Sequence, residues 1–248
     1  YEVCTLTGMY NAEGEGSINA DMTLQRTPLL LLNGFVPDKL LTFKGYAQGE
    51  VKVKGSLARP EVNGELYFDS AYVASEPYGV KMRLCDDQLA INNSRMQFEN
   101  FQLFARNGNA LTLYGYFDFA DFDRMQTYLR MRADNYLLID SKENARSEAY
   151  GKAYVNFLGL VDGPLDALRM RGKLDVLGSS NVTYILRDSP LSTESQLDGL
   201  VKFVNFRKPE TATVAKPPIN GLNMDLTVNV DDGAHVLCAL NPDKSNYV

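Results

Sequence analysis

The stretch GEVKVKG, residues 49–55, alternates apolar and charged side chains between two glycines, and Pro60 follows five residues after the second glycine. The stretch GKAYVNFLG, residues 151–159, repeats this arrangement, with Pro164 again five residues after its last glycine. Alternation with a period of two predicts a β-strand that has one apolar face. Because one such unit cannot bury that face alone, its recurrence predicts a stacked or rolled sheet. The related strand units are expected near residues 45–75 and 149–187.

The composition indicates an all-β protein with minor helix. Of the 248 residues, 45% are hydrophobic and 23% are charged, which excludes a disordered chain and a bundle of membrane helices. The 14 Tyr, 12 Phe and 19 Gly, without any Trp, favour strands joined by tight turns over long helices. No shift in composition marks a domain boundary, so residues 1–248 are expected to form a single β-rich unit. Because the sequence starts at Tyr1 without a methionine, we expect a fragment of a longer protein.

The charge balance argues against a nucleic-acid partner. The formal net charge is −6 and the pI is about 4.9, whereas binding a polyanion requires clustered Lys and Arg. The basic residues are scattered along alternating stretches, as at Lys52 and Lys54. They are expected on a solvated outer face.

A few segments depart from regular alternation. Residues 28–35 begin with a proline and are apolar, which predicts a short helix. Residues 193–204 have apolar side chains spaced by three or four, which predicts a second one. Residues 126–139 fit either a helix or a strand, and the alternation of their apolar residues favours a strand. The polar, proline-containing stretch at 207–218 is expected to be a mobile loop.

The ionisable residues form no recognisable catalytic site. The only histidine, His235, follows a turn at 231–233, and no GxSxG serine accompanies it. The acidic group Asp118, Asp121 and Asp123 lacks the glycine and the final glutamate of a calcium loop, so a polar connection between strands is the better interpretation. We therefore expect no catalytic residue and a protein that is not an enzyme.

Cofactor and metal motifs are also missing from the sequence. The three cysteines, Cys4, Cys85 and Cys238, lie far apart without metal-ligand spacing. Neither a complete dinucleotide fingerprint nor a phosphate-binding loop occurs. No metal and no cofactor are predicted.

What remains is a set of apolar side chains that alternation places in long rows. Such rows form either an ordinary packed core or the lining of a groove for an apolar ligand. The predicted helices are too short to cover a large sheet, so a sheet folded over on itself is expected. The predicted lining residues are Val51, Val53, Leu66, Phe68, Leu111, Leu113, Phe117, Val155, Phe157, Leu222, Met224, Leu226 and Val228.

The order of several motifs resembles a known family. The motifs are PLLLLNGF at residues 28–35, FKGYAQGEVKVKG at 43–55, RP at 59–60 and GEL at 64–66. Together they resemble the C-terminal region of the TamB family of translocation and assembly module proteins, in the AsmA-like superfamily of bridge-like lipid transfer proteins. The likeness continues through residues 108–119, the second strand unit and residues 222–240.

The resemblance implies a fold and a function. The fold would be a long curled, antiparallel, meandering sheet that forms an apolar trough, called a β-taco. The function would be phospholipid transport toward the outer membrane of Gram-negative bacteria, together with outer-membrane protein assembly and secretion. The implied protein is periplasmic and is anchored to the inner membrane through an N-terminal segment outside this sequence. Its partners would be phospholipid acyl chains and, through regions also outside this sequence, a TamA-type outer-membrane barrel. The alternative is a structural or adhesive β-solenoid or β-sandwich with a filled core and no ligand.

Overall fold

The protein is all-β, as predicted, and it forms one long curled sheet. The computed structural model describes residues 4–13, 16–35, 41–56, 59–165, 167–185 and 222–239. Within them, 14 strands join a single sheet and the helical segments are short 3-10 turns. The strands are β1 (Cys4–Asn11), β2 (Ser17–Pro28), β3 (Thr42–Ser56), β4 (Pro60–Ser75), β5 (Val80–Leu84), β6 (Leu89–Asn92), β7 (Arg95–Phe104), β8 (Ala110–Asp118), β9 (Gln126–Ser141), β10 (Ala149–Pro164), β11 (Leu168–Val176), β12 (Asn181–Ile185), β13 (Leu222–Val230) and β14 (His235–Ala239).

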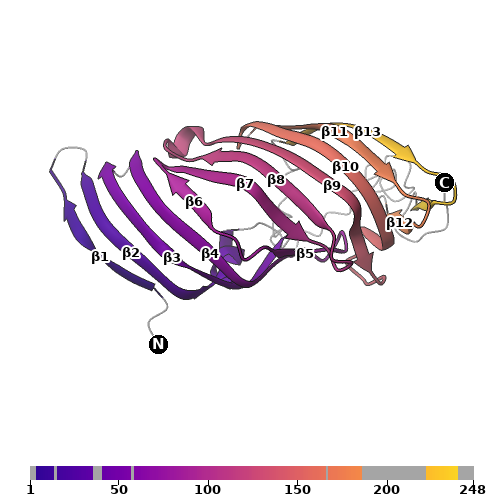
Figure 1. The fold of residues 1–248 in the computed structure, drawn as a ribbon, viewed down its shortest axis with the longest axis horizontal. Coiled ribbons are helices and arrows are strands. Elements are labelled where there is room, and N and C mark those ends of the chain that lie inside the picture. Colours follow the sequence, from indigo (N-terminus) through magenta and orange to yellow (C-terminus); the bar gives the residue numbers. More distant parts are fainter. Residues whose placement is uncertain are drawn as a thin grey trace, which may run out of the picture.

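The strands follow one another along the sheet nearly in chain order, from β1 at one end to β13 at the other (Figure 1). Neighbours from β1 to β11 are antiparallel, in agreement with the predicted meander. The exceptions are β13, which runs parallel to β11, and β14, which runs parallel to β12. The sheet is therefore mixed. Alternation of side chains does not encode strand direction, so the sequence could not reveal this.

At two places in the sheet, two shorter strands pair with the same long neighbouring strand. Both β5 and β6 lie between β4 and β7, and both β11 and β12 pair with β10. Residues 85–88 separate the two shorter strands β5 and β6. A buried serine bridges to the adjacent long strand in each region: the Ser94 Oγ accepts from Val62 N at 2.8 Å, and the Ser180 Oγ accepts from Tyr154 N at 2.9 Å. These hydroxyls supply backbone pairing that the broken strands do not.

Glycines inside the strands allow neighbouring backbones to approach closely. Gly49 has a φ of 150° and Gly115 a φ of 135°, and a Cβ at either position would overlap a carbonyl oxygen of the next strand. Strand register also shifts by a bulge in the β2–β3, β3–β4, β7–β8 and β9–β10 pairs. Bulges increase the local twist of a sheet and bend it. Pro60 lies at the start of β4 in one strand unit, and Pro164 lies at the end of β10 in the other.

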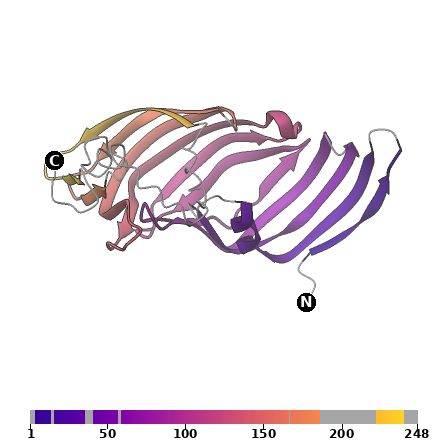
Figure 2. The ribbon, with the colours of Figure 1, turned by 180° about the vertical axis from the view of Figure 1, so that it is seen from behind.

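One short 3-10 helix lies against the sheet. This helix, η1 (Leu29–Phe35), occupies the stretch for which a short helix was expected, and it lies on the side of the sheet seen in Figure 2. Its Leu29 packs on Ala47 and Ala71. A second 3-10 turn, η3 (Phe122–Arg124), precedes β9, where the ambiguous stretch forms the favoured strand. The helix predicted at 193–204 and the loop predicted at 207–218 lie outside the described residues.

Candidate functional site: an apolar face across the sheet

Strand register brings the predicted lining residues onto one face of the sheet, which we call the apolar face. Directly paired residues in neighbouring strands point to the same side. One row of such pairs crosses from β1 to β8 and includes Val51 and Phe117. Its members, in spatial order, are Leu6, Met22, Val51, Gly64, Ile91, Met96 and Phe117.

Two more rows continue from β8 to β13. One contains Leu111, Ala133, Phe157, Leu174 and Val228, and the other contains Leu113, Met131, Gly159, Gly172 and Leu226. The remaining predicted residues belong to the same face by alternation or pairing, namely Val53, Leu66, Phe68, Val155 and Met224. The backbone of Leu222 pairs with Leu168 at the start of β13.

The apolar face also contains residues that are not among the predicted lining residues. Phe101 pairs with Leu113, and Met96 pairs with both Ile91 and Phe117. The signal for Met96 was present, since residues 96 and 98 alternate with polar residues 95, 97 and 99. The bulge at Asn100 then shifts the phase by one residue, so Phe101 rejoins the face at an odd position. Simple alternation fails at such a point.

Burial changes along the apolar face. In the middle of the sheet Val51, Leu113 and Val155 are 4%, 8% and 2% exposed. In β13 the side chains of Met224 and Val228 are 61% and 54% exposed, although they continue the same rows. At the opposite end, Leu6 of β1 is also exposed. The apolar face is therefore closed in its middle and accessible at both described ends.

Aromatic side chains fill much of the central part. The Phe101 ring meets the Phe68 and Phe98 rings edge to face, with centroids 6.0 and 5.7 Å apart. The ring of Phe157 lies over Gly159, where a Cβ would collide with it. Edge-to-face packing adds to the burial of each ring. The centre of this face is thus packed by its own side chains.

Tyr136 is the polar exception within this packed centre. Its side chain is 2% exposed beside Val155 and Val176, and its hydroxyl has no hydrogen-bond partner among the residues that the structure describes. Burial raises the pKa of Tyr136 above its ordinary value, because an ionised phenolate would be poorly solvated there. The hydroxyl therefore stays neutral at physiological pH.

The opposite face, which we call the polar face, carries the charges. Among the paired positions that the structure describes from β1 to β13, the apolar face has no Asp, Glu, Lys or Arg. On the polar face Lys52 lies 3.9 Å from Asp21, and Arg171 lies 3.1 Å from Asp162. Such exposed pairs contribute little to stability, but they mark the side of the sheet that is solvated.

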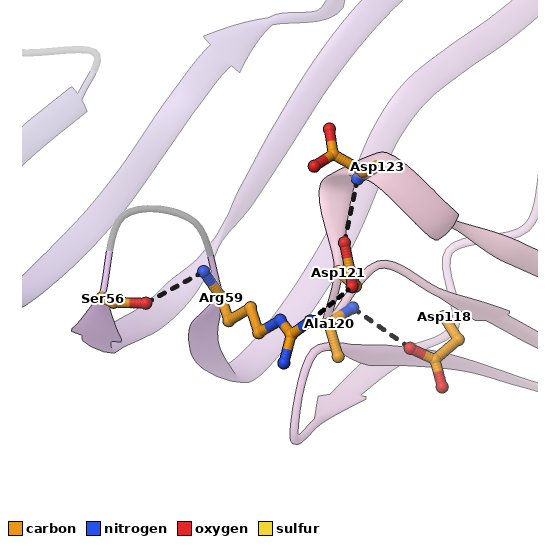
Figure 3. A network of polar contacts seen from close by, with 6 residues as sticks. All are labelled: Ser56, Arg59, Asp118, Ala120, Asp121 and Asp123. Atoms are coloured by element: carbon orange, nitrogen blue, oxygen red, sulfur yellow. Dashed lines mark hydrogen bonds and ion pairs between the residues drawn. The ribbon is translucent and has the colours of Figure 1, made fainter. Parts of the chain in front are cut away.

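The carboxylates of Asp118 and Asp121 accept hydrogen bonds in the connection between β8 and β9, where Asp123 takes part through its backbone N–H (Figure 3). Asp121 caps η3 by accepting from Asp123 N at 3.1 Å and pairs with Arg59 at 3.2 Å. Asp118 accepts from Ala120 N at 3.1 Å and forms an ion pair of 2.7 Å with Arg95. Burial alone would raise the pKa of Asp118, but the hydrogen bonds from Arg95 and Ala120 outweigh it and hold the pKa below its ordinary value. These contacts agree with a polar strand connection.

The other candidate groups lie apart from one another. His235 is exposed at the start of β14, where its backbone N–H bonds to Ser180 O. Cys4, Cys85 and Cys238 are free thiols. Across the described ranges, no group of three or more His, Cys, Asp or Glu side chains is arranged to hold a metal ion. Likewise, no helix in this part of the chain has the length and hydropathy to cross a membrane.

Comparisons with family models, with curated proteins and with solved structures each gave no match to this chain.

Proposed function

We propose that this chain is a segment of a conduit that carries phospholipid acyl chains along its apolar face. The observation that supports the proposal is the continuity of the uncharged rows, which cross the sheet strand after strand from Leu6 to Val228. A small β domain needs an apolar core only in its middle. An apolar face that continues to both ends of the sheet, and is exposed there, provides a continuous surface along which an acyl chain can move.

The strength of acyl binding follows from apolar burial. Each methylene removed from water contributes about 0.8 kcal/mol, so roughly twelve methylenes contribute about 10 kcal/mol. The exposed side chains of Met224 and Val228 in β13 provide apolar surface for the first contacts. The charged groups of the polar face offer none, because an acyl chain there would desolvate ion pairs.

The cellular setting is part of the same proposal. A conduit for phospholipid would act between the two membranes of a Gram-negative envelope. It would be anchored to the inner membrane and would cooperate with a TamA-type barrel through regions outside these residues. Its action would be non-enzymatic transport toward the outer membrane that also supports protein assembly and secretion there. The support for this setting is the motif order described above.

A second function, a structural scaffold with a filled core, has its own supporting observation. The aromatic contacts of Phe68, Phe98 and Phe101 close the middle of the apolar face. A scaffold needs no ligand, and its exposed ends would simply meet other protein. The two functions differ in whether purified protein retains lipid.

The experiment is extraction of the purified protein followed by mass spectrometry, applied to two matched variants. Leu226 lies on the apolar face, half-buried and opposite Gly172, while the adjacent Thr227 is exposed on the polar face opposite Lys173. The conduit predicts that Leu226→Asp loses bound phospholipid and that Thr227→Asp retains it. Denaturation curves of both variants establish that they are folded. Equal lipid content in the two folded variants, or none in the unaltered protein, would contradict the conduit and favour the scaffold.

A further inference from the structure

A cleft lies on the polar face, where several elements of the fold converge. It has a volume of about 700 Å³. Two cross-strand rows form its floor. One row runs from Asp140 through Lys152 to Asn181, and the other includes the Tyr150–Thr183 pair. The described residues that line the cleft are Arg106, Asp140, Ser141, Lys142, Tyr150, Gly151, Lys152, Ser179, Asn181 and Thr183.

The fold requires this convergence. Arg106 comes from the β7–β8 turn, Lys142 from the end of β9, and Ser179 from the interruption between β11 and β12. Gly151 has a φ of 108°, and a Cβ there would overlap Asn181 O. The glycine thus lets β10 and β12 approach closely beneath the cleft. Residues that are distant in sequence are held on one concave surface.

The charges of the cleft are unbalanced. Its one carboxylate, Asp140, is engaged by Arg106 at 2.9 Å. Lys142 and Lys152 have no carboxylate within ion-pair distance in the described part of the chain, even though Lys152 is paired with Asp140 across the ladder. Among the described residues, two ammonium groups therefore line the cleft without a counter-charge, in a protein whose net charge is −6. A concave wall of one sign concentrates its field on a bound counter-ion.

We propose that this cleft binds a phosphate group, either on a small soluble molecule or on a lipid headgroup. A phosphate monoester carries close to two negative charges at neutral pH and presents several strong acceptor oxygens. The two lysines match its charge, and Ser179, Asn181 and Thr183 supply hydroxyl and amide donors. The site is independent of acyl binding, because Lys152 lies on the opposite face of β10 from Val155.

The test is calorimetric titration of the full chain with inorganic phosphate and with glycerol 3-phosphate. The double variant Lys142→Gln/Lys152→Gln removes both charges and keeps most of the side-chain bulk. Each lost charge-assisted hydrogen bond weakens binding about tenfold, so the double variant is expected to bind about a hundredfold more weakly. Raising the salt concentration should weaken binding to the unaltered protein, because exposed charges are screened.

The control is Lys54→Gln, which removes one exposed lysine from the same face in β3. It should leave phosphate binding unchanged. A parallel arm uses vesicles of phosphatidic acid, whose headgroup is a phosphate monoester, and of phosphatidylcholine. Binding to phosphatidic acid vesicles alone, lost in the double variant, would assign the phosphate to a lipid headgroup, and binding to the soluble probes would assign it to a small molecule. No saturable binding to any probe, or equal weakening in the Lys54→Gln control, would overturn the proposal.

Discussion

The two faces of the sheet use apolar residues in opposite ways, as two positions in β10 show. Val155 on the apolar face is 2% exposed between Tyr136 and Val176, whereas Leu158 on the polar face is 64% exposed between Arg132 and Lys173. Both side chains are strongly apolar. Burial here depends on which side of the strand a residue occupies and on its cross-strand neighbours.

The comparison extends along the apolar face itself. Its central residues bury one another because rows on adjacent strands interdigitate around aromatic rings. Its β13 residues continue the pattern but remain exposed. The same alternation therefore produces a core in one region and accessible apolar surface in another, and the second region is where a ligand can bind without displacing packed side chains.

The largest expected effect comes from placing the same charge on each face. Val155→Asp buries a carboxylate beside Tyr136 without a cationic partner, so it should destabilise the fold by more than about 4 kcal/mol or prevent folding. Leu158→Asp places the carboxylate in solvent beside Arg132 and Lys173 and should change stability by less than about 0.5 kcal/mol. Urea denaturation followed by circular dichroism measures both. Comparable losses would mean that the polar face is covered in solution.

A smaller difference is expected between the centre and the end of the apolar face. Phe101→Ala removes a ring that is 5% exposed and packed on Phe68 and Phe98, at an expected loss of about 3–5 kcal/mol. Met224→Ala removes a side chain that is 61% exposed and should lower stability by less than about 1 kcal/mol. Thermal and urea denaturation provide the measurement. A large effect at Met224 would show that β13 is part of the core.

The fold class and the composition of the apolar face could be predicted because both depend on local alternation. Residues 51, 53, 111 and 113 needed only a period of two, and register with their neighbours places them together. The phase of the apolar–polar alternation could not be predicted where a positive-φ residue such as Asn100 inserts a bulge. No local pattern reports that Asn adopts this conformation rather than continuing the strand.

Long-range features could not be predicted for a different reason. The parallel pairing of β11 with β13 depends on how the chain returns to the sheet, and the bridges of Ser94 and Ser180 depend on where a strand is interrupted. The cleft around Lys152 combines residues up to 77 positions apart in the sequence, from Arg106 to Thr183. The individual residues looked like ordinary turn and surface positions, and only the folded sheet gives them common neighbours.

A comparison of a glycine within a strand and a glycine in a turn gives the next test. Gly115 lies within β8 on the apolar face, and a Cβ there would overlap Tyr128 O at a φ of 135°. Gly115→Ala should therefore destabilise the protein by about 2–3 kcal/mol, through strand separation as well as backbone strain. Gly108 in the β7–β8 turn has a φ of 85° but open space around it, so Gly108→Ala should cost about 1 kcal/mol from strain alone. Equal values would remove the close strand approach as a cause of the curl.

The smallest effect is expected for Asp118, the last residue of β8, which forms an ion pair with Arg95. Because its pKa is lowered in the folded protein, its contribution to stability is present above its ordinary pKa of 3.8 and is lost as the pH falls through the lower folded value. Asp118→Asn should cost about 0.5–1 kcal/mol at pH 7, a value kept small by solvent screening, and the two proteins should converge in stability toward pH 2. Urea denaturation across this pH range measures the difference.

The control for Asp118→Asn is Asp87→Asn, which removes an exposed carboxylate that has no ion pair in the described part of the chain. This variant should follow the unaltered protein at every pH. A gap between the unaltered protein and Asp118→Asn that persisted at pH 2 would show that the substitution acts by packing rather than by charge. Since even this well-formed ion pair is expected to contribute less than a single ring on the other face, the polar face contributes solubility and specificity of contact, while the apolar face supplies the stability of the sheet.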